Sequence, residues 1–222
     1  MLYVIVTGGP LQPQAATVIK ALSGSAEDTV IIACDSGTDF LASHDIIPDM
    51  VVGDLDSISD NGLDFIKKNN IFTEKYPVEK DWTDTEIALA KSEEDEVLLV
   101  CPVSGRLDHV IANLGLTLKL KSRGKDIAIT DGVTCCYPLC GEDSVTVDVT
   151  PYDGNAAVSL IPCDFSNPVT GVTTEGLYYS LSDGELNFGL TFSFSNKPLE
   201  NADSISVSIS SGLLLVVVTD AV

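Results

Sequence analysis

The hydrophobic pattern changes its period once along the chain, and this change constrains the fold more than any other feature. Up to about residue 130, short β-branched runs alternate with segments in which apolar residues recur every three to four positions. Such alternation predicts a mostly parallel sheet covered by helices. After about residue 131 apolar and polar residues alternate and turn residues become dense, which predicts an antiparallel sandwich. We therefore expect an α/β domain at residues 1–131 and an all-β antiparallel sandwich domain at residues 132–222.

The same pattern gives the individual elements. In the first domain we expect strands at residues 3–7, 30–34, 50–52, 71–76, 97–101 and 127–130, with helices at 15–22, 38–44, 60–69, 85–92 and 109–121. Val110, Leu114 and Leu118 form one apolar stripe, which is typical of a helix that lies on a sheet. In the second domain we expect strands at residues 145–149, 157–161, 169–174, 177–181, 190–194, 205–209 and 213–218.

The charge balance excludes two kinds of partner. The chain has 12 Lys and Arg against 33 Asp and Glu, a formal net charge of −21. Nucleic acids and anionic membranes attract proteins through clusters of Lys and Arg, so we expect no nucleic-acid or membrane partner. The apolar runs are too short for a membrane span, and the N-terminus lacks a secretory signal pattern. We therefore expect a cytoplasmic protein whose six cysteines are reduced.

Polar residues that follow the strands of the first domain form the candidate site, because ligands of an open parallel sheet bind outside the carboxyl ends of its strands. Four such segments stand at residues 35–37, 53–57, 80–86 and 104–109. All four should converge on one edge of the sheet. After the first strand, Gly9 and its neighbour Gly8 would let the backbone approach a phosphate or a nucleoside.

The strongest chemical signal is a pair of carboxylates. Asp54 and Asp56 are two residues apart, so in extended backbone both side chains point to the same side. With Asp81 or Asp84 nearby they would form an all-oxygen ligand set suited to Mg²⁺. The structural alternative is that Asp-x-Asp-Ser is a turn with Asx hydrogen bonds.

Two further segments also have more than one interpretation. Thr83 and Glu86 fit a capping box, which would give Asp84 a structural role in the first turn of a helix. The segment 104–106, which ends in Arg106, precedes another helix and is a candidate phosphate cradle. His109 is a candidate base or a capping residue. The residues alone indicate a Mg²⁺-dependent enzyme acting on a phosphoanhydride, or a nucleotide-binding module with the same edge.

In this order, the motifs resemble the thiamine pyrophosphokinase family. The residues that carry the resemblance are Gly53-Asp54-Leu55-Asp56-Ser57, Lys80-Asp81-Trp82-Thr83-Asp84-Thr85-Glu86, Gly105-Arg106-Leu107-Asp108-His109, Gly176-Leu177-Tyr178 and Ser195-Asn196. Asp35-Ser36-Gly37 looks like the family's Asp-Gly-Gly turn, with Ser36 in place of the first glycine. The resemblance implies transfer of a diphosphate from ATP to the hydroxyl group of thiamine, with release of AMP and a requirement for Mg²⁺.

The resemblance also implies roles for individual residues. The catalytic and metal-binding residues would be Asp54 and Asp56 with Asp81 or Asp84. A carboxylate near the attacking hydroxyl group could accept its proton, and Asp81 and Asp84 are the candidates. ATP would contact Gly9, Asp35, Ser36, Thr83, Arg106 and Asp108, and thiamine would contact Ser195, Asn196 and Tyr178. The first domain would bind ATP and Mg²⁺, the second would bind thiamine, and a homodimer would form its active sites between subunits. Two alternatives stay open: a diphosphokinase that acts on a hydroxymethylpterin, and a non-catalytic sensor of thiamine or nucleotide.

Overall fold

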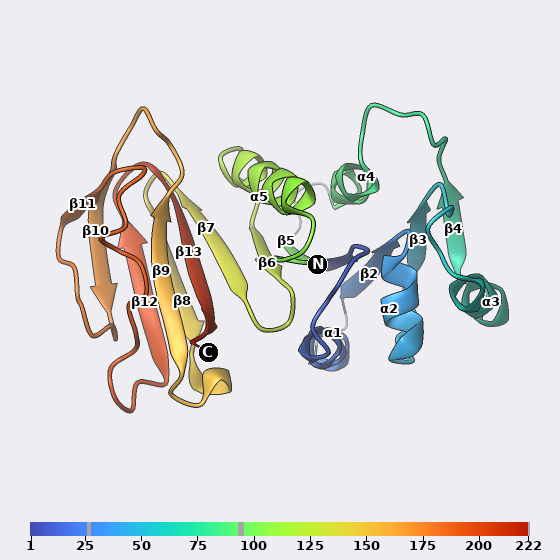
Figure 1. Ribbon diagram of the computed structural model, residues 1–222, viewed down its shortest axis with the longest axis horizontal. Helices are drawn as coiled ribbons and strands as arrows, with labels where there is room; N and C mark the ends of the chain where they lie inside the picture. The colour runs from blue at the N-terminus through green and yellow to red at the C-terminus, as the bar shows by residue number, and fades with distance from the viewer. Residues whose placement is uncertain (26–27, 93–95, 222) are drawn as a thin grey trace. The chain divides into compact units, whose positions relative to one another are not determined.

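The computed structural model describes residues 1–25, 28–92 and 96–221, and the chain divides into two compact units (Figure 1). The first unit comprises residues 1–117 and 125–133, and the second comprises residues 118–124 and the chain from residue 134 onward. Among the described residues, no helix is both long enough and apolar enough to cross a membrane. Each unit has a core of its own.

The first unit is a six-stranded parallel sheet with the strand order β4-β3-β2-β1-β5-β6. Its strands are β1 (Leu2–Val6), β2 (Thr29–Cys34), β3 (Met50–Gly53), β4 (Phe72–Lys75), β5 (Glu96–Val100) and β6 (Ile127–Thr130). Its helices are α1 (Gln14–Ser25), α2 (Gly37–Ser43), α3 (Asp60–Asn69), α4 (Asp84–Ala90) and α5 (Leu107–Lys121), whose last residues belong to the second unit. Every strand and helix expected in this half is present, and the parallel sheet is confirmed. From the central β1 the chain moves outward to β4 and then returns to β5 on the other side.

The core of this unit explains why its strands are continuous apolar runs. Val4, Ala33 and Val51 from three adjacent strands pack with Ile19 of α1 and Leu41 of α2, and all five are buried. A parallel strand that is covered on both faces must be apolar along its whole length. The inner strands therefore lack the period-2 pattern of a half-exposed strand, whereas the edge strand β4 is partly exposed.

Helix α5 forms where it was expected, and its apolar stripe is only partly buried. Val110, Leu114 and Leu118 are only partly buried, Ile111 is 60% exposed, and Thr117 is the buried position among the described residues of this helix. An apolar stripe shows which residues share a helix face but not what covers that face. The stripe of α5 is therefore only partly covered in the described chain.

The second unit consists of two antiparallel sheets, with the orders β7-β13-β9 and β11-β10-β12-β8. Its strands are β7 (Cys135–Cys140), β8 (Asp143–Asp148), β9 (Ala156–Pro162), β10 (Val169–Glu175), β11 (Gly184–Leu186), β12 (Ser204–Ile209) and β13 (Leu213–Asp220), with a short 3₁₀ turn, η1 (Thr150–Tyr152). One core is shared by both sheets and includes Leu160, Val216, Val172 and Val207. The antiparallel sandwich is confirmed.

Two of the expected strands in this unit are wrong, and two observed strands were missed. Residues 177–181 contribute an isolated bridge between Leu177 and Pro198, and residues 190–194 lie in turns. Aromatic residues predict strands because they suit a half-buried surface, but Phe192 is 75% exposed. Strand β7 was missed because Pro138 within it argues against a strand. Strand β11 has three residues, too few for a periodic signal.

Candidate active site

Loops at the carboxyl ends of the parallel strands enclose a cavity of about 430 Å³ in the first unit. Among the residues that line it are Gly8, Gly9, Asp35, Ser36, Ser57, Thr83, Asp84, Ser104, Arg106, His109 and Asn113. The loops after β1, β2 and β5 contribute to this lining, and β1 lies between β2 and β5. The cavity thus lies where the strand order reverses, the usual ligand site of such sheets. Its volume is within the range of small-molecule sites.

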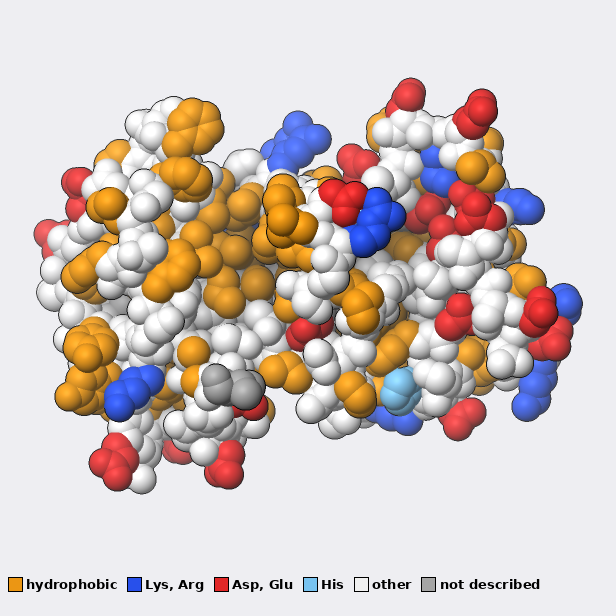
Figure 2. Space-filling view, in the orientation of Figure 1, with side chains coloured by type: hydrophobic (Ala, Val, Ile, Leu, Met, Phe, Trp, Pro, Cys, Tyr) orange, Lys and Arg blue, Asp and Glu red, His pale blue; other side chains and the backbone are white. Residues whose placement is uncertain are grey.

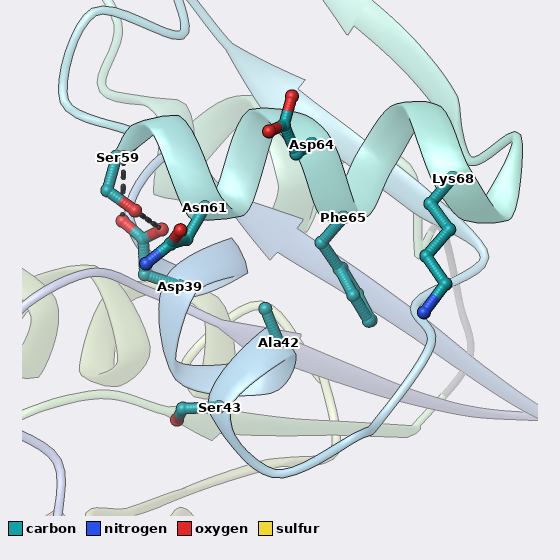
Figure 3. Close-up of a pocket in the computed structure, with 8 residues that line it drawn as sticks. All are labelled: Asp39, Ala42, Ser43, Ser59, Asn61, Asp64, Phe65 and Lys68. Carbon is teal, nitrogen blue, oxygen red and sulfur yellow. Dashed lines mark hydrogen bonds between the residues drawn. The ribbon is translucent and has the colours of Figure 1, made fainter.

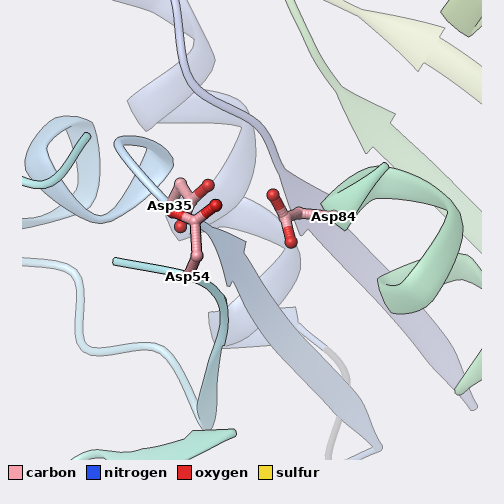
Figure 4. Close-up of side chains that lie close together, drawn as sticks. All are labelled: Asp35, Asp54 and Asp84. Carbon is pink, nitrogen blue, oxygen red and sulfur yellow. The ribbon is translucent and has the colours of Figure 1, made fainter. Parts of the chain in front are cut away.

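Three carboxylates from separate segments meet beside this cavity (Figure 4). Asp35 follows β2, Asp54 follows β3, and Asp84 is the first residue of α4. One oxygen of each lies within 4.8 Å of the others, and all three residues are partly buried. Like charges at this separation require a proton or a cation among them.

The backbone after β3 is shaped around the carboxylate of Asp35. Asp35 and Leu55 have left-handed backbone, with φ of 43° and 69°, and the Leu55 N–H donates to Asp35 Oδ1 at 3.0 Å. Gly53 has φ of 144°, and a Cβ at this position would overlap Asp35 Oδ1. Such strained residues gather where the surrounding structure holds a functional group in place.

The geometry at Asp54 and Asp56 corrects one expectation. The backbone is not extended, because left-handed Leu55 separates them and the Asp56 N–H donates to Asp54 Oδ1 at 3.1 Å. An Asx hydrogen bond, as in the structural alternative, is therefore present, and it leaves Asp54 in the carboxylate cluster. This hydrogen bond lowers the pKa of Asp54, whereas the neighbouring Asp54 carboxylate raises the pKa of Asp56. Asp56 is exposed and lies outside the group of three, whereas Asp54 belongs to it.

A capping box places Asp84. Thr83 Oγ1 accepts from the Glu86 N–H at 3.2 Å, and the Thr83 N–H donates to Glu86 Oε2 at 3.1 Å, as the sequence predicts. The α4 helix therefore begins at Asp84. Its Oδ1 is buried and accepts no hydrogen bond within the described residues, although Lys80 Nζ lies 3.1 Å away as an ion-pair partner.

Lys80 is a member of the site that the sequence interpretation did not assign. Its Nζ also lies 3.6 Å from Asp54 Oδ2, so one ammonium group contacts two of the three carboxylates. The sequence held a signal, since Lys80 precedes Asp84 by four residues. That spacing is ordinary on protein surfaces, however, and only the fold shows that the pair is enclosed.

Burial also perturbs the third carboxylate, Asp35. Burial, followed by the nearby Asp84 carboxylate, raises the pKa of Asp35 to about 7. The cluster is an all-oxygen donor set, which suits a hard divalent cation. The buried Asp84 Oδ1 without a hydrogen bond is the kind of atom that such an ion would satisfy.

The structure brings most of the expected nucleotide residues together. Gly9, Asp35, Ser36, Thr83 and Arg106 all line the cavity. Asp108 is exposed and holds Arg106 by an ion pair of 2.6 Å between Nη2 and Oδ2, which lowers the pKa of Asp108 to about 2. Asp81 is exposed and lies outside the cluster of three carboxylates. His109 lines the cavity beside Asn113, which the sequence interpretation did not assign.

The expected thiamine residues lie in the second unit, whose visible face carries several exposed hydrophobic side chains (Figure 2). Asn196 is buried, and its Oδ1 accepts from the N–H groups of Tyr179 and Lys197 at 3.1 and 2.9 Å. Its Nδ2 donates to the Tyr179 carbonyl at 2.8 Å, so this side chain is engaged with backbone. Ser195 is exposed, and Tyr178 is 56% exposed with Lys197 Nζ 4.9 Å from its ring centroid.

A second, more open cavity of about 630 Å³ lies between α2 and α3 (Figure 3). Asp39 in its wall accepts from the N–H and the Oγ of Ser59, at 3.1 and 2.6 Å, and Ser59 caps α3. Its carboxylate therefore holds two helices together. None of the expected site residues is among the described residues that line this cavity.

Two family models match the chain in sequence order. Residues 24–129 match the model described as "Thiamin pyrophosphokinase, catalytic domain". Residues 144–214 match the model described as "Thiamin pyrophosphokinase, vitamin B1 binding domain". Together the two models cover well over half of the chain.

Individual relatives agree with the family models. The chain is 29% identical over 217 residues to a thiamine pyrophosphokinase of Bacillus subtilis (strain 168), and the match covers 96% of both proteins. It is similar to the crystal structure of thiamine pyrophosphokinase from Bacillus subtilis, with a TM-score of 0.81, 25% identity and 100% of both chains covered. The structure from Geobacillus thermodenitrificans gives a TM-score of 0.78 at 28% identity, covering 99% of this chain and 98% of that one. The chain therefore belongs to the thiamin pyrophosphokinase family and is a diphosphotransferase.

Proposed function

We propose that this protein transfers the terminal diphosphate of ATP to the hydroxyl group of thiamine, forming thiamine diphosphate and AMP in the cytoplasm. The hydroxyl oxygen attacks the β-phosphorus, the bond from that phosphorus to the bridging oxygen breaks, and AMP leaves with that oxygen. The observation that carries the proposal is the meeting of Asp35, Asp54 and Asp84 beside a cavity lined by Gly8 and Gly9. Transfer of this kind depends mainly on alignment and charge neutralisation.

The proposal assigns Mg²⁺ to Asp35, Asp54 and Asp84, with the exposed Asp56 outside this group of three. Their oxygens are close enough to share one ion, and the buried Asp84 oxygen lacks a hydrogen bond within the described chain. When bound, the ion neutralises charge on the polyphosphate. Gly8 and Gly9 line the cavity, where phosphate would bind against their backbone, and Arg106 would donate to phosphate oxygens in place of Asp108.

A carboxylate is needed to accept the proton of the attacking hydroxyl group. The two candidate bases are Asp81 and Asp84. Asp84 lines the cavity, whereas Asp81 is exposed outside the carboxylate cluster. We therefore assign the proton to Asp84.

The proposal places thiamine at Ser195, Asn196 and Tyr178, which fall within the stretch that matches the vitamin B1 binding model. In the described geometry Asn196 shapes the backbone at Tyr179, so its contribution to thiamine would be to hold Tyr178 in position. The resemblance also supports a homodimer. Light scattering after size exclusion would give twice the 23.5 kDa mass of the chain.

The direct test is incubation with thiamine, ATP and Mg²⁺, followed by chromatographic measurement of AMP and thiamine diphosphate. We expect both products in equal amounts, and neither when a hydroxymethylpterin replaces thiamine or when the divalent ion is chelated. Asp84→Asn should lose at least about a hundredfold in kcat/KM. Asp64→Asn removes an exposed carboxylate of α3 and should keep wild-type activity.

Other outcomes would reject the proposal. Absence of both products with correctly folded protein would contradict it. Binding of thiamine without AMP formation would indicate a sensor. Formation of AMP with a hydroxymethylpterin alone would indicate the other acceptor.

A further inference from the structure

Lys80 lies against two carboxylates of the acidic cluster, those of Asp54 and Asp84. Its Nζ lies 3.1 Å from Asp84 Oδ1 and 3.6 Å from Asp54 Oδ2, and it donates to the Pro77 carbonyl at 3.1 Å. Its side chain is 15% exposed, and those of Asp54 and Asp84 are 10% and 18% exposed. Exposed ion pairs are weak because water solvates both partners. This pair is largely shielded, so its charges act strongly on each other.

The ammonium group contacts two of the three carboxylates assigned to the divalent ion. It is also the ion-pair partner of Asp84 Oδ1, the oxygen that accepts no hydrogen bond in the described chain. A divalent ion bound to these oxygens would repel an ammonium group that stayed beside them. Binding of the ion therefore requires Lys80 to withdraw from Asp54 and Asp84.

The fold gives the displaced ammonium group somewhere to go. Lys80 lies between β4 and α4, three residues before Thr83, which lines the cavity together with Asp84. A lysine side chain is a flexible four-carbon stem that carries a point charge. Phosphate oxygens in the cavity would be new acceptors for the ammonium group within reach of the lysine side chain.

We propose that Lys80 is an internal counter-cation that neutralises Asp54 and Asp84 in the metal-free site and passes to a phosphate oxygen when the divalent ion and nucleotide bind. This inference rests on the proposed function, because it needs a polyphosphate as the second partner. It couples the two ligands. Binding of the ion alone breaks the ion pairs of Lys80 with Asp54 and Asp84. When a nucleotide binds as well, its phosphate gives Lys80 a new partner.

The first test measures Mn²⁺ binding without nucleotide, from the electron paramagnetic resonance signal of the free ion. Lys80→Met keeps the length of the stem and removes the charge, and should bind Mn²⁺ at least about tenfold more tightly, since a unit charge about 4 Å away matters that much at protein-like dielectric. Lys91→Met is the matched control, because Lys91 also pairs with a carboxylate, Glu74, at 2.6 Å. The control should bind Mn²⁺ as the wild type does.

A non-hydrolysable ATP analogue should tighten Mn²⁺ binding of the wild type more than that of Lys80→Met. Unchanged or weaker Mn²⁺ affinity in Lys80→Met would overturn the proposal. An equal increase in Mn²⁺ affinity of both proteins on addition of the analogue would also overturn it.

A second measurement needs no substitution. Acetylation of the wild type with a soluble anhydride, followed by mass spectrometry of peptides, reports how free each lysine is. With Mg²⁺ alone, acetylation of Lys80 should accelerate several-fold over the metal-free protein, while Lys91 should not change. An unchanged or slower rate at Lys80 would refute the exchange.

These experiments stand apart from the test of the overall reaction. If the wild type forms AMP and thiamine diphosphate but Lys80→Met binds Mn²⁺ normally, only the counter-cation idea fails. If Lys80→Met binds Mn²⁺ more tightly but the wild type forms no product, the proposed reaction fails while the ion exchange at the cluster stands.

Discussion

Gly53→Ala is the sharpest test of how the site is built, because it adds one methyl group to the residue that faces Asp35. Gly53 has φ of 144°, and its new Cβ would overlap Asp35 Oδ1. The strained backbone alone should cost about 1–3 kcal/mol of stability. The carboxylate must also move, and a misplacement of about 1 Å in a reacting site costs about a hundredfold in rate. We expect kcat/KM to fall by at least that factor and Mn²⁺ affinity to fall with it.

The control is Gly124→Ala. Gly124 also has positive φ, at 89°, but a Cβ there meets no atom within 4 Å. It should lose about 1–2 kcal/mol from strain and keep both Mn²⁺ affinity and kcat/KM. Urea unfolding of the two variants measures the cost of backbone strain. Their Mn²⁺ binding and steady-state kinetics measure the effect of displacing the Asp35 carboxylate. Wild-type Mn²⁺ affinity in folded Gly53→Ala would refute the claim that Gly53 makes room for Asp35.

Three further outcomes follow from single side chains. Thr83→Ala removes half of the capping box and should lower the free energy of unfolding by about 1 kcal/mol, measured with urea. Asn196→Ala leaves the N–H and carbonyl of Tyr179 without their side-chain partner; it should cost about 1–3 kcal/mol, and faster amide exchange at Tyr179 would locate the loss. Because the pKa of Asp35 is raised from 3.8 to about 7, the folded state binds its proton more tightly than the unfolded state. The free energy of unfolding of the metal-free wild type, relative to that of Asp35→Asn, should therefore fall as pH rises from about 4 to 7. A difference in urea midpoints between the two proteins that does not change with pH would contradict the raised pKa of Asp35.

The parts of this protein that the sequence predicts well are those with a local cause. Thr83 and Glu86 are three residues apart, and their reciprocal hydrogen bonds need only the first turn of α4. Strands β1, β2, β3, β5 and β6 are mostly buried, so each is visible as a continuous apolar run. Strand β4 at the sheet edge is more exposed and gives a weaker signal. Convergence at the carboxyl edge follows from the strand order, which explains why Gly9, Asp35 and Arg106 were expected beside one cavity.

The parts that the sequence does not predict depend on distant or unusual backbone. Leu55 in left-handed conformation breaks the extended backbone between Asp54 and Asp56, and Asp56 is not among the three clustered carboxylates. A leucine gives no signal for that conformation. Asp35 joins Asp54 because two parallel strands end side by side and the Leu55 N–H binds its carboxylate. In the second unit, exposed aromatics such as Phe192 imitate the pattern of a strand, since periodicity reports an apolar surface but not its burial.

The net charge of −21 argues against an anionic substrate only while the charges are counted without their partners. At the cavity edge Lys80 is paired with Asp84, and Arg106 is paired with Asp108. Each basic group is therefore neutralised until another anion competes for it. In the proposed function, a polyphosphate with its divalent ion would release both, because Asp54 and Asp84 would hold the ion while phosphate oxygens would replace the carboxylates around Lys80 and Arg106. Exchange of partners, rather than an excess of positive charge, is how an acidic protein of this kind can hold a nucleotide.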